Sequence, residues 1–209
     1  MSKPFRNILK NLNSSKAHPE PTLITTTSST PTPPPTPKMS PYPPVRVITT
    51  SHTPTGRSTI LSDSLLPAHH PFGPTASGFT TIHAIPSLPA SLITPPTASA
   101  PSVPRPLPNG TVLCTTDFPP NYITPTHRTV TCDYMVVLKG ELVLRVDGGE
   151  ERVLKEGDVV VQRGTMHTWE NRTGEWTRCL AFMAGAQKIV LADGQPLEES
   201  FTPPAKKSG

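Results

Sequence analysis

The chain has 209 residues, enough for one ordinary domain, and its formal net charge of +4 is divided unevenly. Residues 1–108 hold 23 of the 29 prolines and eight Lys or Arg against two acids, whereas residues 109–209 hold 13 acids and 11 bases. The positive residues are scattered among Pro, Ser and Thr, without the clustered stripe of a nucleic-acid-binding surface. No run approaches the roughly 18 apolar residues of a membrane span. We therefore expect neither nucleic acid nor membrane as a partner.

Residues 1–44 are basic and rich in Pro, Ser and Thr, so we predict a disordered arm. The opening stretch MSKPFRNILKNLNSSK has basic residues and apolar residues at helical spacing, which is typical of a mitochondrial transit peptide. The three cysteines, by contrast, have no zinc or disulfide spacing and fit reduced thiols. We expect a cytoplasmic protein, with mitochondrial targeting as the alternative.

Residues 45–108 are predicted to contain the first strands of the fold. VRVITT and STILSD read as short strands around a turn at Thr55-Gly56, and GFTTIHAI at 78–85 as a third. The stretch 86–108 is again rich in Pro and Ala, and we expect it to wrap the domain surface or to be partly loose.

Residues 109–193 form the predicted core of the domain, and 194–209 a tail. The core contains seven strand signals: TVLCTT, DYMVVL, ELVLRV, ERVL, DVVVQ, MHTWEN and WTRCLAFM. Glycine-containing turns separate most of them, at Lys139-Gly140, Asp147-Gly148-Gly149, Glu156-Gly157, Arg163-Gly164 and Thr173-Gly174. This pattern predicts an all-β fold, a small antiparallel jelly-roll barrel whose edges are closed by the strands between 45 and 85.

Strand alternation predicts which polar side chains share a face, because successive residues point to opposite sides. His127, Thr129, Thr131 and Asp133 have one parity, and His167, Trp169 and Asn171 share another strand face. If both sets face the interior, two imidazoles and one carboxylate converge there. That is the composition of the facial triad that binds non-haem iron. Tyr134 and Cys132 should point away from this cavity.

The sequence resembles the cupins, whose two motifs are G-x5-H-x-H-x3,4-E-x6-G and G-x5-P-x-G-x2-H-x3-N. Asp133 stands at the Glu position, six residues before Gly140, which makes His127 the first His and places Thr129 at the second His position. Gly157 opens the second motif, and His167 with Asn171 keeps H-x3-N. The departures are the lost second His, the shortened acid, Arg163-Gly164 in place of Pro-x-Gly, and a loop one residue shorter.

Over residues 44–193 the chain is most similar to small single-domain cupins, on stretches such as PNGTVLCTTDFPPN and QRGTMHTWEN. Fungal members of that group are cupin-domain oxidoreductases encoded beside polyketide synthases, including salicylaldehyde-type clusters. The resemblance implies an oxidoreductase that acts on a small aromatic or polyketide-derived intermediate in secondary metabolism. By analogy with other cupin barrels we expect a homodimer.

In this reading His127, Asp133 and His167 bind Fe(II), or Mn or Zn. His167 is catalytic, and Thr129, Trp169 and Asn171 contact substrate. No nucleotide cofactor is expected, because no G-x-G-x-x-G follows a strand.

Each of these residues also has an ordinary interpretation. His167 fits a hydrogen-bonded core histidine, His127 a surface loop residue, and Asp133 a turn cap or a partner of Arg128 or Arg145. The shorter Asp133 side chain raises the question of whether it reaches a metal placed for Glu. Two other functions therefore stay open: a metal-free acid/base enzyme (isomerase, dehydratase or decarboxylase), and a non-catalytic barrel that binds a small molecule.

Overall fold

The computed structural model describes residues 39–92 and 103–202. Most of the predicted arm, part of the predicted wrapping segment and the end of the predicted tail lie outside these ranges. The described residues form strands and no helix. The strands are β1 (Val45–His52), β2 (Ser58–Leu66), β3 (Gly78–Ile85), β4 (Thr111–Phe118), β5 (Tyr122–Ile123), β6 (Thr126–Arg128), β7 (Thr131–Lys139), β8 (Leu142–Val146), β9 (Glu151–Leu154), β10 (Val159–Arg163), β11 (His167–Asn171), β12 (Thr177–Gly185) and β13 (Ser200–Thr202).

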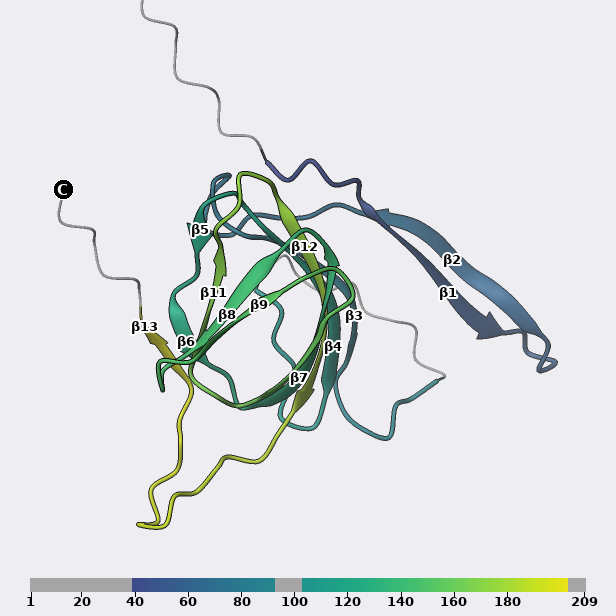
Figure 1. The fold of residues 1–209 in the computed structure, drawn as a ribbon. Coiled ribbons are helices and arrows are strands. Elements are labelled where there is room, and N and C mark those ends of the chain that lie inside the picture. Colours follow the sequence, from purple (N-terminus) through teal and green to yellow (C-terminus); the bar gives the residue numbers. More distant parts are fainter. Residues whose placement is uncertain (1–38, 93–102, 203–209) are drawn as a thin grey trace, which may run out of the picture. The chain divides into compact units, whose positions relative to one another are not determined.

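Two antiparallel sheets build the barrel. One has the order β10-β7-β12-β4-β3, and the other has the order β13-β6-β11-β8-β9, with β5 paired to β11. Both sheets curve around a shared interior (Figure 1). The predicted all-β jelly-roll class is confirmed. Four of the five predicted glycine turns contain a glycine with positive φ, a conformation that costs other residues energy.

The core lies between the two sheets, and strand alternation determines its membership. In β7 the buried residues recur at every second position, from Thr131 to Val137, whereas Tyr134 between them is 47% exposed. The apolar part of the core comprises Val112, Cys114, Phe118, Met135, Val137, Leu142, Leu154, Trp169, Cys179 and Ala181. The outward direction predicted for Tyr134 is therefore confirmed.

The hairpin of β1 and β2 corrects one prediction. These strands pair with each other from Val45↔Leu66 to His52↔Ser58 and form a separate two-stranded sheet. Of the three early strands, β3 alone extends a barrel sheet, by pairing with β4. The sequence pattern predicts both strands but not their partner, because a turn at Gly56 lets the hairpin satisfy its own backbone hydrogen bonds.

The end of the predicted arm is held against the barrel by a buried ion pair. Arg178 binds Asp117 through Nε and Nη2 at 2.6 and 2.8 Å, and Asp117 is 1% exposed. Ser40 donates its hydroxyl hydrogen bond to the same carboxylate, and the Tyr42 ring lies 4.7 Å from the Arg178 guanidinium carbon. Within the described residues, contacts with the barrel thus begin at Ser40, inside the segment predicted as the arm.

Candidate functional site

The barrel encloses a cavity of ≈ 170 Å³ that both sheets line. Its walls are mainly apolar and include Phe79, Phe118, Tyr122, Met135, Trp169 and Met183. The polar side chains that line it are Ser77, Arg105, Thr116, Thr124, His127, Thr129, Asp133, Gln162 and His167. An apolar pocket with a few convergent polar groups is the usual form of a small-molecule site.

Two histidines meet at this cavity because their strands pair there. His127 of β6 is directly opposite His167 of β11, and their ring centroids are 4.2 Å apart. Nδ1 of His127 lies 2.9 Å from the carbonyl oxygen of Pro125, and Nδ1 of His167 lies 3.0 Å from that of Thr165. A carbonyl only accepts hydrogen bonds, so each Nδ1 is the donor. In a neutral imidazole this leaves the lone pair on Nε2.

Both imidazoles are neutral at pH 7. Burial lowers the pKa of His127, and the backbone hydrogen bond to Pro125 only partly offsets it. Burial and the neighbouring His127 lower the pKa of His167 to about 4. Nε2 of each ring is therefore available to accept a proton or a hydrogen bond from a bound molecule.

Asp133 projects into the same cavity from β7. The residue is 8% exposed, and its Oδ1 is buried without a hydrogen-bond partner among the described residues. Burial raises the pKa of this carboxyl to about 6, although a hydrogen bond from Thr131 opposes the shift. Burial and the nearby Asp133 also raise the pKa of the Cys114 thiol to about 12, so this thiol is protonated and unreactive.

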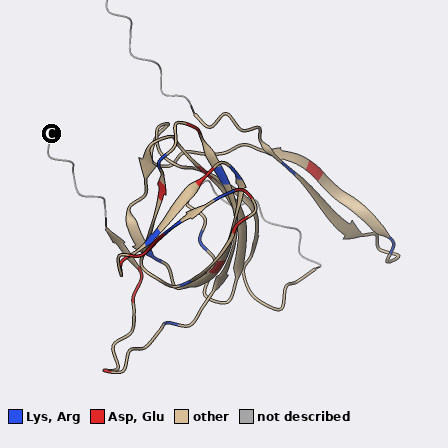
Figure 2. Ribbon diagram, viewed as in Figure 1, with Lys and Arg blue, Asp and Glu red and all other residues tan. Residues whose placement is uncertain are grey.

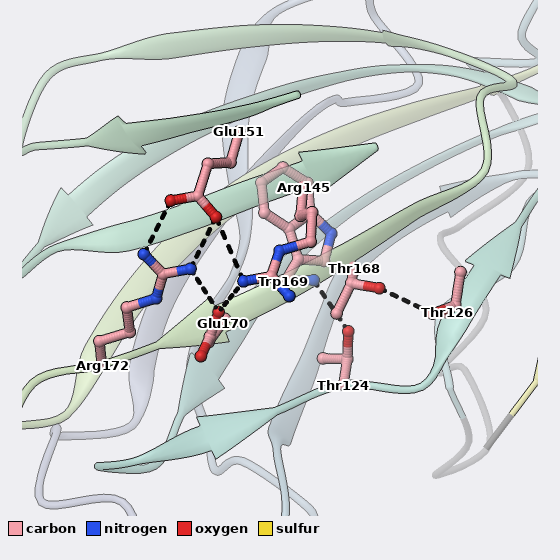
Figure 3. Close-up of polar contacts among 8 residues, drawn as sticks. All are labelled: Thr124, Thr126, Arg145, Glu151, Thr168, Trp169, Glu170 and Arg172. Atoms are coloured by element: carbon pink, nitrogen blue, oxygen red, sulfur yellow. Dashed lines mark hydrogen bonds and ion pairs between the residues drawn. The ribbon is translucent and has the colours of Figure 1, made fainter. Parts of the chain in front are cut away.

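Trp169 forms part of the cavity wall beside His167. Its ring meets the His167 ring edge-on, with centroids 5.3 Å apart. Two contacts fasten this stretch of β11 to the neighbouring segment: the Trp169 backbone N–H donates to Thr124 Oγ1 at 3.0 Å, and the hydroxyls of Thr126 and Thr168 are 2.9 Å apart (Figure 3).

An ion-pair network borders the opposite face of the same strands. Arg145 contacts the carboxylates of Glu151 and Glu170 at 3.2 and 3.1 Å, and Arg172 contacts the same pair at 2.7 and 2.9 Å (Figure 3). Glu170 and Trp169 are consecutive, so alternation directs the charge outward and the ring inward. Elsewhere on the described barrel, positive and negative residues are interspersed (Figure 2).

Most of the predicted site residues converge as expected. His127, Thr129, Asp133, His167 and Trp169 all line the cavity. Whether they perform the predicted roles stays a prediction.

Asn171 is the exception and requires a correction. It is completely buried, and its Nδ2 donates to the carbonyls of Phe118, Pro119 and Glu175, while its Oδ1 accepts from Thr173. Both ends of the side-chain amide thus have hydrogen-bond partners in the protein, and Asn171 does not line the cavity. Its function is to hold the β11–β12 turn rather than to contact substrate.

Sequence reasoning missed several lining residues, among them Gln162 and Arg105. Gln162 of β10 lies opposite Asp133 of β7. The alternation of residues in DVVVQ could have indicated that Gln162 faces the cavity. Arg105 comes from the Pro-rich stretch, where no periodicity indicates a direction, yet its charge lowers the pKa of His127. His127 itself lies in β6, which is too short for a strand signal.

The donor set does not fit the predicted three-ligand metal site. Within residues 39–92 and 103–202, no three or more His, Cys, Asp or Glu side chains are grouped so that they could hold a metal ion. His127 and His167 are close together and Asp133 lines the same cavity, but the three do not form such a group. No membrane-spanning helix occurs in the same ranges.

Comparison with known proteins finds matches to the barrel region of this chain. Residues 114–183 match the family model for the cupin domain Cupin_2. Oryzines biosynthesis cluster protein J of Aspergillus oryzae is 44% identical over 95 residues, which cover 46% of this chain and 53% of that protein. The cupin-domain-containing oxidoreductase virC of Hypocrea virens is 44% identical over 89 residues, 43% of each chain. The chain thus matches about half the length of these relatives.

Among solved structures, the polyketide cyclase RemF from Streptomyces resistomycificus is 19% identical with a TM-score of 0.41, over 66% of this chain and 79% of that one. KdgF from Halomonas sp. is 13% identical with a TM-score of 0.41, over 58% and 89%. The family match falls on the strands that enclose the cavity. Residues 114–183 of this chain are similar to a cupin domain.

Proposed function

We propose that this chain is a cupin-domain oxidoreductase that acts on a small aromatic or polyketide-derived intermediate of fungal secondary metabolism. The observation that carries the proposal is the pair of neutral imidazoles, His127 and His167, facing an apolar cavity beside a buried carboxylate. Fungal relatives that share this barrel sequence bear the name oxidoreductase, which favours redox chemistry over passive binding.

The size of the cavity supports a substrate with about one ring at the reacting end. A dry apolar cavity of about 150 Å³ holds benzene, and this cavity is ≈ 170 Å³. Trp169 and Phe118 offer flat surfaces for such a ring. The Thr129 hydroxyl, 2.6 Å from that of Thr131, can accept a hydrogen bond from a substrate hydroxyl.

Oxidation of a hydroxyl or an activated C–H bond removes two electrons and releases a proton, which we expect His167 to accept. Its Nε2 lone pair is free, and its Nδ1–H is anchored on Thr165, so the ring is held in the tautomer of a general base. With a pKa of about 4, His167 is unprotonated throughout the neutral range. Asp133, with a pKa of about 6, can take or return a second proton near neutral pH.

The two electrons pass to an external acceptor, dioxygen or a nicotinamide nucleotide, and no step is assigned to a metal. Fe(II), Mn or Zn as a cofactor remains a prediction from the resemblance. Cytoplasmic location and a homodimer stay predictions as well.

The test begins with metabolite profiles of strains with and without the gene. Purified protein is then added to whatever accumulates, in air, with and without ferrous ion and with and without a nicotinamide nucleotide. The expected product differs from the precursor by loss of hydrogen or gain of oxygen. An inactive protein under every condition would contradict the proposal.

A second candidate is metal-free acid/base catalysis by the same histidine–carboxylate arrangement, although the names of the fungal relatives favour oxidation. In that case the product is an isomer, or has lost water or carbon dioxide, and chelators have no effect. The mass of the product separates the two candidates directly.

A further inference from the structure

A second cavity of ≈ 180 Å³ lies outside the site described above. Its walls are the β6–β7 connection over 128–132, the end of β10 at Arg163 and Gly164, and the segment 186–189 with Leu197. Backbone hydrogen bonds fasten these walls together: Ala186 N–H donates to the Val130 carbonyl, and Leu197 N–H to that of Ile189. Thr129 lines both cavities.

This second cavity has a strongly positive lining. Three cationic side chains contribute to it, Arg128, Arg163 and Lys188, and no Asp or Glu does. Lys188 is neutralised by Glu198 at 2.7 Å, but neither arginine forms an ion pair within the part of the chain that the structure describes. Glu199, the other nearby acid, accepts a backbone hydrogen bond from Val130 and is not part of the lining.

One of the two arginines also has an unsatisfied donor. Nε of Arg128 is buried and has no hydrogen-bond partner among the described residues. A buried donor left unpaired is destabilising, and more so when it is charged. Such groups are normally satisfied by protein, ordered water or a ligand.

We propose that this second cavity binds an oxyanion, a carboxylate or phosphate group of a small molecule, between Arg128 and Arg163. The planar guanidinium fork matches the oxygens of either group and binds them in bidentate fashion. The polar residues Thr131 and Gln187 also line the cavity and offer further hydrogen bonds. This proposal does not depend on the proposed oxidoreductase activity.

The test is titration calorimetry on the full chain at low ionic strength, with inorganic phosphate in one arm and acetate in the other. We expect saturable binding of at least one probe with one site per chain, and the tighter probe identifies the type of oxyanion. Arg128→Gln and Arg163→Gln should each weaken binding tenfold or more. Arg57→Gln, which removes the same charge from the exposed β1–β2 turn, should leave it unchanged.

Cys132 supplies an independent readout, because its half-buried thiol lines the second cavity while Cys114 and Cys179 are buried. The bound anion should slow alkylation of Cys132 by iodoacetamide, and should fail to do so in Arg163→Gln. Because Arg163 is exposed, this variant should fold even if Arg128→Gln does not. Absence of saturable binding for both probes, or equal binding by Arg163→Gln, would overturn the proposal.

Discussion

Replacement of Asp133 by Asn should stabilise the protein at neutral pH, and the gain should vanish in acid. Burial raises the pKa of the carboxyl from 3.8 to about 6. A raised folded-state pKa contributes stability that is fully present below pH 3.8 and is lost as the pH rises through 6. Each pKa unit corresponds to about 1.36 kcal/mol, so the ionised Asp133 costs roughly 3 kcal/mol above pH 7. The neutral amide of Asn avoids that cost.

The assay is urea unfolding at pH 4, 5, 6, 7 and 8 in the presence of a chelator, followed by tryptophan fluorescence. The stability difference between Asp133→Asn and the parent should grow from near zero at pH 4 to roughly 3 kcal/mol at pH 8. Both proteins keep His167, so its titration largely cancels from the difference. Asp147→Asn, at an exposed turn, is the control and should show no such trend. A pH-independent difference, or one of opposite sign, would refute the reasoning.

Four further substitutions follow from the same structure. Because the pKa of His167 is about 4, the free energy of unfolding of the parent should fall by roughly 3 kcal/mol as the pH drops from 6.5 to about 4. Urea unfolding of His167→Gln should not show this decrease. Asp117→Asn leaves Arg178 buried without its counterion and should cost about 3–5 kcal/mol in urea unfolding. Trp169→Ala should cost about 3–5 kcal/mol and weaken binding of one-ring ligands in calorimetry. Arg145→Ala, in the exposed network, should shift the unfolding free energy by no more than about 1 kcal/mol.

The strands of the barrel were predictable because local pattern determines them. In DYMVVL the alternation of buried and exposed residues follows from the pleat, and it placed Asp133 inward and Tyr134 outward correctly. The glycine turns between the strands were equally visible. β5, β6 and β13 were missed because two or three residues show no periodicity, and Pro125 separates β5 from β6.

The site was predictable only in part, because parity indicates a face and not what occupies it. His167 and Asn171 have the same parity, yet His167 lines the cavity, whereas the Asn171 side chain is hydrogen-bonded to loop carbonyls. The same limit applies to the hairpin of β1 and β2, whose pairing partner depends on tertiary contacts that the strand signal does not contain. Arg105 was missed for a related reason, since a Pro-rich segment without regular structure carries no directional signal.

The most direct test of the central claim, that the His127–His167 cavity is the reaction site, is the turnover of the accumulated intermediate by the parent and by His167→Gln. We predict an oxidised product from the parent and at least a hundredfold loss of turnover in His167→Gln, the range that removal of a general base produces. Binding of the intermediate should change much less. Equal turnover by the two proteins would contradict the account and leave the cavity as a binding site without catalysis.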